Sequence, residues 1–260
     1  MQHPLLFTKR PYLLTLSIVA MITSVNLALF GGTLVLRDVP PVQMEFLAEM
    51  AMTLMVIGLL VLLNGWGRVG FRALRSVKDL RLYWIPVVPL IPVLGAVVAG
   101  MSRMHPRDVA LLLALACLIG FVEEVSFRGL ILQALASRGV WRAAVISSIL
   151  FGLMHLQNLL FGADLVATVL QIAYATAMGF GFASVTLRTG SIWPLVAIHA
   201  LIDFAGFVTS GGTVIDSLTG TDVAVYALYI VAFTGYGVFN MRAMKRSREN
   251  IADMAPAVSS

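Results

Sequence analysis

Long apolar runs separated by short polar or basic segments extend along the chain from Tyr12 to Asn240. Most of these runs approach the roughly 17 to 25 residues that an α-helix needs to cross the hydrocarbon layer of a bilayer. We count eight of them, at residues 12–36, 46–64, 84–101, 109–136, 141–157, 165–187, 192–207 and 223–240. The pattern predicts an all-α, polytopic membrane helix bundle with about eight transmembrane helices.

The composition supports a membrane protein, because 59% of the residues are hydrophobic and 12% are charged, far from the averages of soluble domains. Lys9 and Arg10 precede the first run, as in a signal peptide. That run is too long for a signal peptide and no Ala-x-Ala cleavage site follows, so we expect it to remain in the mature protein. Cys117 is the single cysteine, which excludes an internal disulfide, and we expect it in the core.

Basic residues are distributed unequally between the two sides of the predicted membrane. With both termini cytoplasmic, 15 of the 18 Lys and Arg residues lie on the cytoplasmic side, and only Arg37, Arg103 and Arg107 lie outside. This positive-inside asymmetry predicts cytoplasmic termini and a multi-pass protein of the cell membrane, in a prokaryote the inner membrane. It also accounts for the net charge of +5, so we expect membrane lipid as a partner and no nucleic acid.

Three ionisable residues, Glu123, Glu124 and Arg128, lie within the fourth predicted helix. A charge at the centre of a bilayer costs about 2.5 to 3.5 kcal/mol on insertion scales, so three in one helix indicate a function. Glu124 and Arg128 are four residues apart and share a helix face, which favours an ion pair. Glu123 points about 100° away from Glu124 and remains available for chemistry.

His155 is the expected counterpart of Glu123. Both lie 16 residues from Gly139, which is in the turn between the fourth and fifth predicted helices. In an antiparallel hairpin with equal rise per residue, the two side chains lie at the same depth and can face each other. Both then lie about 24 Å from their turn, so this hairpin must project beyond the membrane to meet the seventh helix.

The seventh predicted helix adds His199 and Asp203, which are four residues apart on one face. An Asp beside a His fixes the orientation of the imidazole and favours a well-aimed N–H donor. A carboxylate base, two imidazoles and an orienting acid on three helices are suited to activating water against a carbonyl.

Three motifs carry a resemblance to a known family. They are, in order, Glu123-Glu124-Val-Ser-Phe-Arg128, Phe151-Gly-Leu-Met-His155 and His199-Ala-Leu-Ile-Asp203. They are similar to the Glu-Glu-x-x-x-Arg, Phe-x-x-x-His and His-x-x-x-Asn/Asp motifs of the CAAX protease and bacteriocin-processing family. The resemblance covers residues 84–207. It implies an intramembrane glutamic endopeptidase, related to the CAAX prenyl protease type 2, that acts on a peptide or a membrane-associated protein.

The resemblance also implies a role for each residue. Glu123 is the general base that polarises a water, and His155 holds or shares the water's proton. His199 and Asp203 serve the oxyanion side. An ionised Asp cannot donate a hydrogen bond, so we expect Asp203 to orient His199. Glu124 and Arg128 support the site as an ion pair. The resemblance also implies a site without metal or cofactor.

The single membrane domain divides into three parts. Residues 1–83 hold the first two helices and a basic segment, 65–83, whose helical spacing is typical of a helix lying on the cytoplasmic leaflet. Residues 84–207 form the catalytic core implied by the resemblance. Residues 208–260 hold an external loop rich in Gly, Ser and Thr, at 208–222, then the last helix and a basic tail.

Other interpretations stay open. Glu, His and Asp are also zinc ligands, although a His-Glu-x-x-His helix, the mark of many zinc metalloproteases, is absent from the sequence. A non-proteolytic scaffold, a self-immunity protein or a proton-coupled carrier could keep the same polar residues in the membrane. Glu45 and Glu49 are the only competing carboxylates at an apolar run. No His accompanies them, so we expect them to reach the interface or to pair locally rather than to take part in catalysis.

Overall fold

The computed structural model describes residues 9–36, 38–210 and 220–254, and over these ranges it is a helix bundle without strands. Seven helices are long and apolar enough to cross a membrane, or eight if one bent pair counts as a span. The spanning helices are α2 Pro11–Val35, α3 Pro41–Leu62, the continuous run α6 Pro106–Glu124, η2 Val125–Ile131 and α7 Leu132–Ala136, α8 Val140–Met154 with η3 His155–Phe161, α9 Leu165–Thr189, α10 Trp193–Ser210 and α11 Gly220–Met254. The prediction of an all-α polytopic membrane bundle is confirmed. The middle of the expected external loop, residues 211–219, lies outside the described ranges.

The bent pair is the third predicted span, which is broken rather than straight. Its parts are η1 Val77–Tyr83 with α4 Trp84–Val87, and α5 Leu90–Met101, and they meet at an angle of 71°. Pro86 and Pro89 lie at the break. Because proline lacks the N–H that the helix ladder needs and clashes with the preceding turn, it bends or ends a helix.

The basic segment before η1 does not form the interfacial helix that its spacing predicts. Residues 65–76 are turns and bends, and Gly70 adopts a left-handed φ of 88°. The N–H of Ile192 donates to the carbonyl of Gly70 at 3.1 Å, and the hydroxyl of Ser191 donates to the carbonyl of Arg72 at 2.7 Å. The segment is therefore tied to the connection between α9 and α10, and its backbone hydrogen bonds replace those of a helix.

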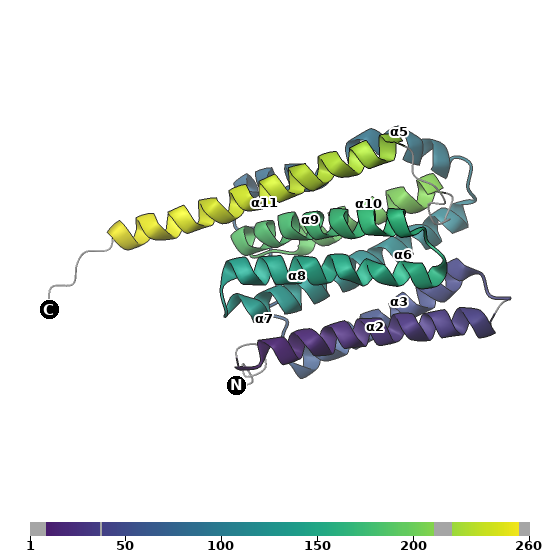
Figure 1. Cartoon of the computed structure of the whole chain (residues 1–260), viewed down its shortest axis with the longest axis horizontal. Coiled ribbons are helices and arrows are strands. Elements are labelled where there is room, and N and C mark those ends of the chain that lie inside the picture. Colours follow the sequence, from purple (N-terminus) through teal and green to yellow (C-terminus); the bar gives the residue numbers. More distant parts are fainter. Residues whose placement is uncertain (1–8, 37, 211–219, 255–260) are drawn as a thin grey trace.

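The helices that carry the motif residues pack side by side. Figure 1 shows α6, α8, α9 and α10 in the middle of the bundle, with α2 and α3 along one side and α11 along the other. Within the long span of α6, η2 and α7, which covers 31 residues, the chain extends about 45 Å, well beyond a hydrocarbon layer of about 30 Å. This excess length is what the expected projection of the α7–α8 hairpin requires.

A close approach between α6 and α10 occurs at Gly120. A Cβ atom at this position would lie 2.9 Å from the backbone nitrogen of Ala200 and 3.0 Å from the carbonyl oxygen of Val196. Only glycine fits there without moving the backbones apart. Since Gly120 lies one turn before Glu124, and Ala200 follows His199, this contact sets the distance across the candidate site.

Cys117 is exposed rather than buried in the core, contrary to expectation. The buried stripe of α6 includes Leu112, Leu115, Ala116 and Gly120. Cys117 follows Ala116 by one residue, which turns it about 100° around the helix and off this stripe.

Candidate active site

The most buried part of the site is the ion pair between Glu124 and Arg128. Nη1 of Arg128 lies 2.9 Å from Oε1 of Glu124, and the two side chains are 1% and 0% exposed. The guanidinium carbon also lies 4.1 Å from the centre of the Phe151 ring and 5.4 Å from that of Phe182. Cation–π contacts and a carboxylate thus replace water around this cation. The spacing-based expectation of this pair agrees with the geometry.

The pair lies where α6 changes into the π-helix η2. All seven residues of η2 are buried, Arg128 among them. π-helical turns are rare and occur often at functional sites, because they re-aim side chains within an otherwise regular helix. Here the change follows directly after the two glutamates.

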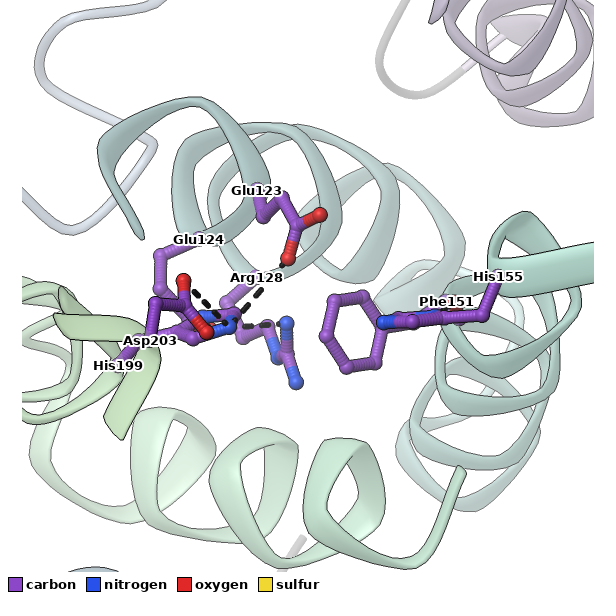
Figure 2. Close-up of polar contacts among 7 residues, drawn as sticks. All are labelled: Glu123, Glu124, Arg128, Phe151, His155, His199 and Asp203. Atoms are coloured by element: carbon purple, nitrogen blue, oxygen red, sulfur yellow. Dashed lines mark hydrogen bonds and ion pairs between the residues drawn. The ribbon is translucent and has the colours of Figure 1, made fainter. Parts of the chain in front are cut away.

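His199 lies between three carboxylates (Figure 2). Its Nδ1 is 2.9 Å from Oε1 of Glu124, while its Nε2 is 3.3 Å from Oε2 of Glu123 and 3.7 Å from Oδ2 of Asp203. The sequence predicted only the contact with Asp203, which is the longest of the three. The shortest joins residues 75 positions apart and follows from the packing of α6 on α10.

The geometry restricts the protonation states of His199 and of the carboxyl groups that face it. A neutral imidazole has one N–H, and an ionised carboxylate only accepts hydrogen bonds. Each nitrogen of His199 nevertheless faces a carboxylate oxygen. Hydrogen bonds from both nitrogens therefore require an extra proton in the cluster, either as an imidazolium or on one of the facing carboxyl groups.

The two glutamates differ in burial. Glu123 is 28% exposed and Asp203 23%, whereas Glu124 is fully buried and His199 nearly so. Glu124 and Arg128 form the closed floor of the site, and Glu123 and Asp203 form its open side. The division between a supporting carboxylate and a reactive one stays a prediction, and the exposed fractions show only that Glu123 is the more accessible of the two glutamates.

His155 is the first residue of η3, directly after the end of α8. Its Nδ1 lies 3.1 Å from the carbonyl oxygen of Phe151, which can only accept, so Nδ1 carries the hydrogen and Nε2 keeps a lone pair. The Phe151 ring packs edge-on against His155 at 5.4 Å and against His199 at 5.8 Å (Figure 2). Among the described residues, no hydrogen bond or ion pair joins His155 to Glu123, which contacts His199 instead.

Within the described ranges, no three His, Cys, Asp or Glu side chains are arranged as a metal site. The donors that could serve one, on His199 and the three acids around it, bind one another.

The fold and site define a polytopic helical membrane protein with a buried network of Glu, His, Arg and Asp. A comparison with known protein families finds a match to part of this chain. The family described as Type II CAAX prenyl endopeptidase Rce1-like matches residues 105–205, which contain all six predicted site residues. The match confirms the resemblance to the CAAX protease and bacteriocin-processing family that the motifs predicted.

A protein of Bacillus subtilis (strain 168) with the name "Putative membrane peptidase YdiL" is 34% identical over 99 residues. The alignment covers 37% of this chain and 36% of that relative, so it spans about a third of the relative's length. No solved structure matches the chain.

Proposed function

We propose that this protein is an intramembrane endopeptidase that hydrolyses a peptide bond with a water activated by Glu123. The observation that carries the proposal is the position of His199, whose two nitrogens lie against Glu123 and Glu124 above a buried arginine. The match to the Rce1-like family over this same segment supports it. The protein would act in the cell membrane, in a prokaryote the inner membrane, on a peptide or membrane-associated protein.

In the proposed reaction, Glu123 accepts a proton from a water, and the water oxygen attacks the carbonyl carbon of the scissile bond. The electron pair of the carbonyl moves to its oxygen. That oxyanion is stabilised by the N–H at Nε2 of His199, which points toward the open side of the site. When the C–N bond breaks, the proton on Glu123 passes to the leaving amine. Water is consumed, and a carboxylic acid and an amine are formed.

The remaining residues hold these groups in place. Glu124 accepts from Nδ1 of His199 and so directs Nε2 toward Glu123 and Asp203. Arg128 balances the charge of Glu124 in a place that water does not reach. His155 presents the lone pair of Nε2, which can accept a hydrogen bond from the attacking water.

The test compares membranes of host cells that express the wild type, E123Q, H155A or the control D38N. Asp38 is exposed and lies away from the site, so D38N makes the same acid-to-amide change without touching the network. Mass spectrometry of new peptide ends should find products with the wild type and D38N. We expect E123Q and H155A to lose them by about 10² or more, the usual contribution of a general base. Products at wild-type levels with a folded E123Q variant would disprove the assignment.

A further inference from the structure

Helix α3 carries a polar stripe that the reaction described above does not use. Glu45, Glu49 and Thr53 follow one another at intervals of four residues, so they share a face of the helix. Ionisable residues within membrane spans are costly and usually serve a function. Their expected local pairing is not observed, because Glu45 and Glu49 are both acids and no ion pair to either is present among the described residues.

Helix α3 packs against α6, the helix that carries the two glutamates of the site. Val42, near the start of α3, packs against the cluster that contains Leu112 and Ala116 of α6. Val69, shortly after the end of α3, lies against Gly129 beyond the end of α6. The two helices therefore run in the same direction with a fixed register.

This register sets the depth of Glu49. It lies seven residues beyond Val42, about 10 Å along α3, and the same advance from Leu112 and Ala116 reaches residues 119–123 of α6. Glu49 thus lies at the level of Glu123.

The carboxyl group of Glu49 is not fully satisfied by hydrogen bonds among the described residues. Its Oε2 atom and the hydroxyl of Thr53, one turn further, are buried and have no hydrogen-bond partner among the described residues. A buried polar atom without a partner costs about 1–3 kcal/mol. Glu123, Glu45 and Asp203 all lie close enough to act electrostatically on the Glu49 carboxyl group. This proximity agrees with the register of α3 against α6.

We propose that Glu49 is a positioning residue for Glu123, with the two carboxyl groups sharing one proton directly or through a single water. Two adjacent carboxylates do not both stay ionised, and a shared proton is the usual solution. The proton leaves one oxygen of Glu123 as the acceptor for the attacking water and fixes its direction. This inference rests on the proposed function and adds a second carboxyl group to its site.

The first test measures kcat, KM and the thermal midpoint in detergent for E49Q and E49L. Leu fills the space but cannot hydrogen-bond, so kcat should fall about 100-fold with KM little changed, as expected for a misplaced catalytic group. The thermal midpoint of E49L should change little, because the shared hydrogen bond is lost together with the cost of burying the Glu49 carboxyl group. Gln can still donate, so E49Q should keep most of the rate. N26L, a polar-to-apolar change on α2 whose side chain bonds only its own helix, is the control.

Two results would overturn the inference: a kcat of E49L near that of the wild type, or a loss of kcat that parallels a loss of thermal stability. A second measurement needs no substrate. If the two carboxyl groups share a proton, the midpoint shifts of E49Q and E123Q should not add in the double variant, whereas additive shifts would contradict contact. Failure of the proposed function is distinguishable, because E123Q would then cleave like the wild type whatever the E49 variants do.

Discussion

Substitution of Gly120 by Ala tests whether the spacing of α6 and α10 sets the site. The added Cβ would lie 2.9 Å and 3.0 Å from backbone atoms of α10, where ordinary contacts begin at 3.4 Å, so the helices must separate by about 0.5 Å. Backbone atoms cannot rotate away as a side chain can. The 2.9 Å contact between Glu124 and Nδ1 of His199 lies on the next turn and would lengthen with this separation.

Two effects on stability oppose each other in G120A. Overpacking in a close-packed core costs about 1–3 kcal/mol, while replacing a helical glycine by alanine gains about 0.5–1 kcal/mol. The net effect is therefore a destabilisation of up to about 2.5 kcal/mol. Displacement of His199 by about 0.5 Å should lower the cleavage rate by more than this stability loss explains, by about 10-fold, since a 1 Å misplacement can cost about 10²-fold.

The assay measures the thermal midpoint in detergent and the rate at which peptide ends appear. G58A on α3 is the matched control, because a Cβ on Gly58 would meet nothing within 4 Å and only the gain in helix propensity remains. Its midpoint should equal or exceed that of the wild type, with unchanged cleavage. If G120A also keeps the wild-type midpoint and rate, the packing at Gly120 does not control the site.

Three further changes test the surrounding framework. R128M should lower stability by about 3–5 kcal/mol in chemical unfolding, because it leaves the carboxylate of Glu124 buried without the guanidinium that balances its charge. E124Q/R128M should recover part of this loss, and equal stability of R128M and wild type would contradict the buried pair. S191A should cost about 1 kcal/mol and increase proteolysis of the 65–76 segment, since it removes the hydrogen bond to the carbonyl of Arg72, and unchanged proteolysis would argue against that tether. G139A should cost about 1–2 kcal/mol in the same unfolding assay, since φ is 118° in this turn, and a neutral result would mean that the turn relaxes.

Local sequence spacing predicted the parts of the site that lie within one helix. The pair of Glu124 and Arg128 and the pair of His199 and Asp203 both follow from an interval of four residues. Hydrophobic run lengths likewise predicted the spans, and the turn at Gly139 matches the end of α7 and the start of α8.

Contacts between helices could not be derived in this way. The bond from His199 to Glu124 depends on how closely α6 approaches α10, and the level of Glu49 depends on the register of α3 against α6. The 65–76 segment has the spacing of a basic helix. Its glycines and its tether to Ser191 and Ile192 outweigh that pattern, since tertiary hydrogen bonds satisfy the backbone instead.

Because Cys117 is exposed, a probe attached to it can measure how deep α6 lies in a bilayer. It is the chain's single thiol, and it lies on α6 seven residues before Glu124, about 10 Å along the axis. A spin label attached there, read against lipid-soluble and water-soluble relaxants, would report how deep this turn lies in a bilayer. The depth of the site then follows from helix geometry, without any label near the chemistry.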